Sequence, residues 1–123
     1  MPYLPTYDSR DIRYKDPYGA VASGTQVQFT LRPPRAEGYS HASMSARFES
    51  RHDEIVILKM PWQGHKLGQD LFSAELDTVG YTGLIWYSFR LEKLNGSTQD
   101  LGPYQLTVYD GEEDVPAWFG EGT

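Results

Sequence analysis

The chain has 123 residues, with 17 acidic and 11 basic side chains, a formal net charge of -6 and no cysteine. This length fits one domain with a single core and excludes a (β/α)₈ barrel, which needs about 250 residues. The lack of cysteine excludes a disulfide scaffold, a thiolate zinc site and a thiol nucleophile. The acidic charge argues against a nucleic-acid or anionic-membrane partner, and no apolar stretch approaches the ~20 residues of a membrane span. The first residues lack the basic and apolar regions of a signal peptide, which favours the cytoplasm.

Glycine and proline are frequent, with 12 and 8 residues, and aromatic residues make up 14% of the chain. Frequent chain breaks and many rings indicate short strands rather than long helices. The first clear strand covers residues 26–31, where Val27, Phe29 and Leu31 alternate with polar side chains until a pair of prolines stops the strand. Such alternation predicts a strand with one buried and one solvent-facing side.

Residues 39–60 form the one stretch longer than a dozen positions without glycine or proline. Apolar and polar residues alternate around Ala46, residues 50–53 are typical of a turn, and residues 55–58 are apolar and largely β-branched. We therefore expect two strands joined by a turn. A helix over residues 44–57 is the alternative.

Three further stretches alternate in the same way and cover residues 72–76, 84–94 and 104–109. Asn95 and Gly96 follow the second of them and are typical of a tight turn, although they also begin a glycosylation sequon. About seven strands at intervals of roughly ten residues predict an all-β fold, an antiparallel β-sandwich.

The ends of the chain are expected to lie outside this sandwich core. Residues 1–22 are interpreted as an N-terminal strap with a first strand, residues 23–109 as the sandwich core and residues 110–123 as a linker. The linker ends in an apolar segment with Trp118 and Phe119. A free chain end rarely carries such a pair, so we expect the two rings to dock on a segment that follows and the chain to be a fragment.

Catalytic motifs are missing from the sequence. His41, His52 and His65 lack the close pairing that metal sites show on one element, and they are interpreted as surface or turn residues. The chain has no Gly-x-Ser-x-Gly elbow, phosphate loop or dinucleotide fingerprint. The acidic run at residues 110–114 is interpreted as solvated linker, with calcium binding as the alternative. We expect neither a metal site nor a cofactor.

Aromatic side chains are the candidates for a binding role, because exposed rings can stack on the C–H faces of sugars. Trp86 lies in the polar register of its strand together with Arg90, whereas Trp62 follows a proline in a loop-like context. Tyr39 and Tyr81 are further candidates in loops. Each tryptophan can serve as a sugar platform, as an interface anchor or as a core residue, and for Trp86 we favour the interface.

Four motifs resemble one family in the family's own order. They are Tyr-Asp-Ser-Arg at residues 7–10 with Tyr-Lys-Asp-Pro-Tyr-Gly-Ala-Val at 14–21 and Gly24-Thr25, Gly-Leu-Ile-Trp-Tyr-Ser-Phe at 83–89, Tyr-Gln-Leu-Thr-Val-Tyr-Asp at 104–110, and Val-Pro-Ala-Trp-Phe-Gly-Glu-Gly at 115–122. Together they resemble the N-terminal β-sandwich of neopullulanase, cyclomaltodextrinase and related α-glycosidases of glycoside hydrolase family thirteen, in the α-amylase superfamily. The resemblance covers about a third of the chain, and residues 33–80 show no detailed match.

The resemblance implies an immunoglobulin-like module of the early-set, starch-binding type, placed before a catalytic barrel in the same polypeptide. The family's catalytic aspartate and glutamate lie on that barrel, so no catalytic residue carries over to this chain. Such modules help to bind α-glucan (maltooligosaccharide, starch or glycogen), or they build a homodimer in which one module walls the partner's active site. We therefore expect a non-catalytic accessory module, with a purely structural or dimerising sandwich as the alternative. A cell-surface adhesion domain fits the fold but not the apolar tail.

Overall fold

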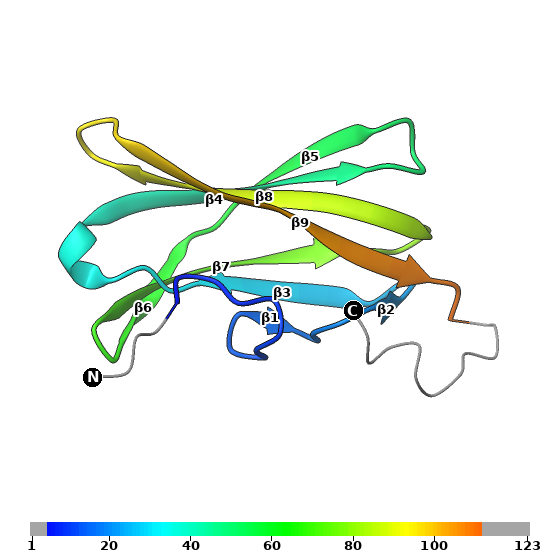
Figure 1. Cartoon of the computed structure of the whole chain (residues 1–123), viewed down its shortest axis with the longest axis horizontal. Helices are drawn as coiled ribbons and strands as arrows, with labels where there is room; N and C mark the ends of the chain where they lie inside the picture. The colour runs from blue at the N-terminus through cyan, green and yellow to red at the C-terminus, as the bar shows by residue number, and fades with distance from the viewer. Residues whose placement is uncertain (1–4, 112–123) are drawn as a thin grey trace.

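The computed structural model describes residues 5–111, which form two stacked β-sheets (Figure 1). The four-stranded sheet has the order β1(Lys15–Asp16), β3(Gln26–Leu31), β7(Gln69–Asp77), β6(Trp62–Lys66). The five-stranded sheet has the order β2(Val21–Ala22), β9(Thr98–Tyr109), β8(Gly83–Lys93), β4(Tyr39–Phe48), β5(Glu54–Lys59). The single helical turn, η1(Arg35–Glu37), is a 3-10 helix, and no helix within residues 5–111 is long and apolar enough to cross a membrane.

The predicted all-β sandwich is confirmed. Six of the longer strands, β3, β4, β5, β7, β8 and β9, correspond to the stretches that the sequence pattern predicts as strands. β6 was not predicted, and β1 and β2 add two residues each. All pairs are antiparallel except β2 with β9, where Val21 lies beside Val108 in parallel. Residues 39–60 form β4 and β5 with a turn between them, so the helical alternative for this stretch is wrong.

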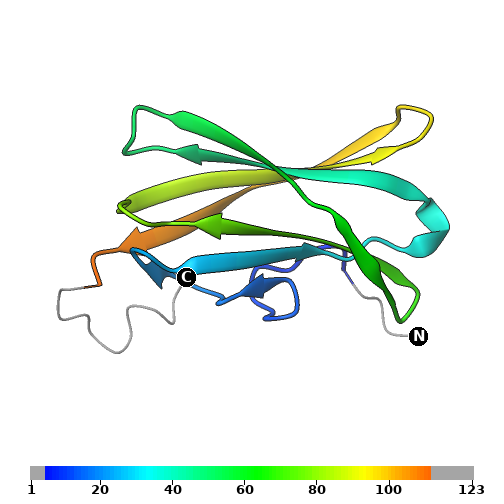
Figure 2. The same ribbon diagram turned by 180° about the vertical axis from the view of Figure 1, so that it is seen from behind.

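Burial follows the predicted alternation. Val27, Phe29 and Leu31 of β3 face the other sheet and are fully enclosed, as are alternate residues of β4, β8 and the end of β9. β5 differs because it is the edge of its sheet (Figures 1 and 2). Its Ile55 and Ile57 lie on the outer face, opposite Arg47 and Ser45 of β4, and remain 58% and 70% exposed.

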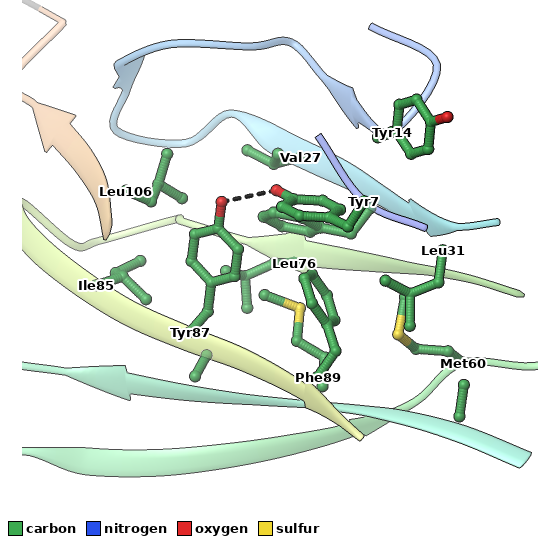
Figure 3. Packing of buried hydrophobic residues seen from close by; sticks show 14 of the residues in the cluster. Tyr7, Tyr14, Val27, Leu31, Met60, Leu76, Ile85, Tyr87, Phe89 and Leu106 are labelled. Atoms are coloured by element: carbon green, nitrogen blue, oxygen red, sulfur yellow. Dashed lines mark hydrogen bonds between the residues drawn. The ribbon is translucent and has the colours of Figure 1, made fainter. Parts of the chain in front are cut away.

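The N-terminal strap is fixed to the sandwich by an aromatic cluster (Figure 3). Tyr7 packs at ring-centroid distances of 4.7 Å from Phe89 and 4.9 Å from Tyr104. Its hydroxyl forms a hydrogen bond of 2.7 Å with the Tyr87 hydroxyl, and burial raises the pKa of both phenols, that of Tyr87 to about 12. The strap thus packs against β8 and β9 through Tyr7. The tail with Trp118 and Phe119 lies outside the described residues.

Lys15 of β1 is a buried cation. Its Nζ donates hydrogen bonds to the carbonyl oxygens of Pro17 at 3.0 Å and Gly19 at 2.8 Å. Both acceptors are neutral, so the ammonium loses solvation without gaining an opposite charge. Burial accordingly lowers the pKa of Lys15 from 10.5 to about 8.

Replacing Tyr87 by Phe leaves the buried Tyr7 hydroxyl without its partner. We expect Tyr87→Phe to lower the free energy of unfolding by about 1–3 kcal/mol, as measured by denaturant melts. The double variant Tyr7→Phe/Tyr87→Phe is the matched control, because it removes both hydroxyls. It should recover much of the loss, and a double variant less stable than the single one would contradict this role.

Because the pKa of Lys15 is lowered in the folded chain, the free energy of unfolding depends on pH. Between about pH 8 and 10.5 the unfolded chain binds more protons at this side chain than the folded one, so the free energy of unfolding rises with pH. From pH 7 to ~9.5 we expect Lys15 to contribute about 2 kcal/mol to this rise. Lys15→Met should lack this contribution in denaturant melts across that range, and parallel pH profiles for the two proteins would contradict it.

Candidate functional site

A groove opens where the chain passes from one sheet to the other. After β5 the chain crosses at Met60 and Pro61 and enters β6 at Trp62 (Figure 2). Met60 is buried, and its amide donates to the Ala42 carbonyl oxygen at 2.9 Å, which fixes the crossing point. Because β5 pairs with β4 only from Ser43 onward, the first residues of β4 have no strand on that side. A cavity of about 490 Å³ occupies this place.

Trp62 is the exposed ring of the groove. It lies opposite Phe72 of β7, a core residue, so its side chain is on the inner face of β6. β6 is an edge strand, and 52% of the residue remains exposed. The indole Nε1 donates to Asp70 Oδ1 at 3.0 Å, and Arg35 Nε lies 3.3 Å from the same oxygen. The buried Asp70 carboxylate therefore fixes one edge of the ring. The loop-like context expected for Trp62 is in fact the start of a strand.

Polar residues of the five-stranded sheet also line the groove. Ser43 and Arg90 are paired across β4 and β8, and His41 and Glu92 form the next pair on the same, outer face. Lys59 lies at the end of β5. The lining of the groove thus combines hydroxyl, imidazole, cationic and carboxylate groups with an indole and the apolar residues Met60 and Pro61.

Arg90 is held by an ion pair at the rim. Its Nε and Nη2 donate to the two carboxylate oxygens of Asp100 at 2.7 and 3.1 Å. These hydrogen bonds lower the pKa of Asp100 and raise that of Arg90. A guanidinium has five N–H donors, so donors remain for a ligand in the groove after this bidentate pairing.

Tyr39 lies on the other side of Trp62. A second depression of about 410 Å³ is bounded by Tyr39, Ser40, Trp62 and Asp70. The Tyr39 hydroxyl donates to Gln99 Oε1 at 2.6 Å, and Lys93 Nζ is 5.3 Å from the ring centroid. Trp62 and Ser40 border both hollows, so the two adjoin at these residues.

Trp86 and Tyr81 are not part of this groove. Trp86 is half-buried on the outer face of β8, as predicted, where Arg47 covers its ring at 5.7 Å and Glu49 Oε1 accepts from its Nε1 at 3.2 Å. Tyr81 is only 3% exposed and packs edge-on against Phe48 at 4.9 Å. Its ring fills the core and offers no surface to a ligand, so we leave Tyr81 out of the candidate site.

Sequence reasoning brought Trp62, Arg90 and Tyr39 forward but missed Asp70, which orients the indole. A signal was present, because Asp70 lies two residues before the core residue Phe72 and shares its inward register. An inward carboxylate implies a buried hydrogen-bond donor nearby. Within residues 5–111 no cluster of three or more histidines and carboxylates could hold a metal ion.

The arrangement is suited to binding rather than to chemistry. An exposed indole, an apolar wall and a few convergent polar groups are the usual components of a site for a neutral polar ligand. Glu92 is the one carboxylate-bearing residue that lines the main cavity in the described part of the chain. No protein-family model matches the chain, and neither does any curated protein.

Proposed function

We propose that this chain is a non-catalytic accessory module of an α-glucan-degrading glycosidase and that the groove at Trp62 binds a segment of the glucan. The observation that carries the proposal is the half-exposed Trp62 indole, which lines a cavity of about 490 Å³. A hydrogen bond from its N–H to Asp70 holds the ring in place. The choice of α-glucan rests on the resemblance of the four sequence motifs to the family-thirteen sandwich modules.

The proposed roles follow from the chemistry of a pyranose ring. Its C–H face is apolar and stacks on an indole, while its hydroxyls both donate and accept hydrogen bonds. Trp62 supplies the stacking surface. Arg90 and Lys59 donate to sugar oxygens, and Glu92 accepts from sugar hydroxyls. None of these contacts needs a charged ligand, which suits an uncharged glucan in an acidic module.

Hydrolysis is assigned to the catalytic barrel proposed to follow in the same polypeptide. Glycosidases use two carboxyl groups that flank the bond they cleave. Among residues 5–111, Glu92 is the one carboxylate that lines the main cavity, and Asp70 accepts a hydrogen bond from Trp62 at the neighbouring hollow. The module therefore contributes substrate binding or the shape of the active site.

Titration of the purified chain with maltoheptaose tests the groove. We expect a Kd on the order of millimolar, or ~4 kcal/mol, in line with one stacked ring and a few hydrogen bonds. Trp62→Ala should weaken binding at least about tenfold, because it removes the stacking surface. It should also lower the melting temperature modestly, because the buried Asp70 carboxylate keeps only its contact with Arg35. Calorimetry or NMR titration provides the measurement.

Trp86→Ala is the matched control, because it removes a surface tryptophan of the other sheet that does not line the groove. It should bind maltoheptaose as the unchanged chain does. Equal affinity of Trp62→Ala and the unchanged chain, or loss of binding only in Trp86→Ala, would exclude the groove as the glucan site.

A second candidate function, dimerisation without sugar binding, is favoured by β5. This edge strand presents Ile55 and Ile57 at 58% and 70% exposure, and no described strand pairs with its free side. Long apolar edge strands are usually protected, and an unprotected one is a surface for pairing with another chain. As an alternative to the groove, this edge is proposed as the subunit contact of the full enzyme.

Sedimentation measurements over a range of protein concentrations test this contact. If β5 is the interface, Ile57→Lys should shift the chain toward monomer, because it places a charge in the middle of the apolar edge. Val79→Lys is the control, since Val79 is exposed to a similar extent, 66%, in the turn after β7. Identical sedimentation of the unchanged chain and the Ile57→Lys variant would rule out the contact.

A further inference from the structure

A cationic pocket lies on the outer face of the four-stranded sheet. Its volume is about 370 Å³, and Arg13, Arg32 and Lys66 line it together with the hydroxyls of Thr30 and Ser73. No carboxylate lines it in the part of the chain that the structure describes. Three cations in one hollow are notable in a chain whose net charge is -6. Such a concentration of charge favours an anionic ligand.

Arg32 is the most enclosed of these cations. It continues the outward register of Gln28 and Thr30 on β3, but the N-terminal strap covers it and leaves the residue only 5% exposed. The amide of Arg32 donates to the Thr6 carbonyl oxygen at 2.8 Å, and its guanidinium carbon lies 5.7 Å from the centroid of the Tyr14 ring. The Nε and Nη2 atoms of Arg32 are buried without a hydrogen-bond partner.

Buried guanidinium nitrogens without acceptors are unfavourable, because they have lost water, and the Tyr14 ring offers them no hydrogen-bond acceptor of comparable strength. The charge of Arg32 contributes to lowering the pKa of Asp11, but both oxygens of this carboxylate already accept from Arg13, Oδ1 from Nε at 3.1 Å and Oδ2 from Nη2 at 2.6 Å. Asp8 also interacts with the charge of Arg13, so two carboxylates lie near the three cations. These five groups together keep one net positive charge.

We propose that the pocket binds the phosphate group of a ligand, with Arg32 at its floor and Arg13 and Lys66 at its rim. The two unpartnered nitrogens of Arg32 and the net positive charge of the pocket favour an oxyanion. Hydroxyl groups add neutral donors, since Thr30 Oγ1 and Ser73 Oγ lie 2.9 Å apart on neighbouring strands. A tetrahedral oxyanion offers more acceptor sites than a carboxylate and so can use guanidinium, ammonium and hydroxyl donors together.

This site is independent of the proposed glucan groove. The groove is formed by inner-face residues of β6 and by β4, β5 and β8, whereas the cationic pocket lies on the outer face of β3 and β7. Gln63, next to Trp62 in the chain, lines the pocket and not the groove. If the groove does not bind glucan, the phosphate proposal is therefore unaffected. If the pocket does not bind phosphate, the glucan proposal is likewise unaffected.

Thermal melts and ¹⁵N NMR titration at about pH 8, where a phosphate group is largely dianionic, test the site. Inorganic phosphate should raise the melting temperature saturably over chloride at equal ionic strength and shift the amide signals of Thr30, Arg32 and Ser73. Acetate at the same ionic strength should do neither. If glucose 6-phosphate binds more tightly than inorganic phosphate, the ligand is a sugar phosphate. If inorganic phosphate binds more tightly, the ligand is the free ion.

Lys66→Ser and Lys59→Ser are matched variants, because both remove an exposed lysine from the end of an edge strand. Lys66→Ser should weaken phosphate binding about three- to fivefold, whereas Lys59→Ser should leave it unchanged. Arg32→Met should abolish the phosphate response. The proposal is overturned if phosphate acts no differently from chloride or acetate, or if the two lysine variants bind phosphate equally.

Discussion

The packing of Tyr7 against β8 and β9 is the constraint on which the outer sites depend. This ring fixes the strap to the core through Phe89, Tyr104 and the hydroxyl of Tyr87. Once the strap is fixed, its backbone pairs with Arg32 at Thr6 and covers that side chain. The core contact therefore decides whether Arg32 is an ordinary surface cation or the enclosed floor of a pocket. Tyr7 thus contributes to the packing between the sheets and also determines how far Arg32 is enclosed on the outer face of the four-stranded sheet.

The groove at Trp62 has a different origin, in the path of the chain. The crossing at Met60 and Pro61 carries the chain directly from the edge strand β5 of one sheet to the edge strand β6 of the other. Both β5 and β6 are edge strands because of this crossing, which leaves Trp62 and Ile57 exposed on strands that follow each other directly. The two proposed functions, glucan binding and subunit contact, thus use surfaces produced by the same topological step.

The sequence predicted regular elements well and contacts between elements poorly. Alternation in β3 and β8 reports directly which residues are buried, since successive side chains of a strand point to opposite faces. Tyr81 has no such register, because it lies in a turn, and its burial against Phe48 arises only from the fold. Trp62 and Arg90 were each recognised as candidates, but they lie on different sheets, so nothing local in the sequence brings them to one groove. Arg32 carried no signal, because the strap that buries it is distant in the chain.

The distribution of ring types has an optical consequence. The described tryptophans, Trp62 and Trp86, lie at the surface and donate their indole N–H groups to the carboxylates of Asp70 and Glu49. Within residues 5–111 the enclosed rings are all tyrosine or phenylalanine. Tryptophan emission from these two sites should therefore respond to ligands more than to loss of the core. Tyrosine absorbance and the near-ultraviolet circular dichroism of the buried phenols are the signals that follow the packing of the sandwich itself.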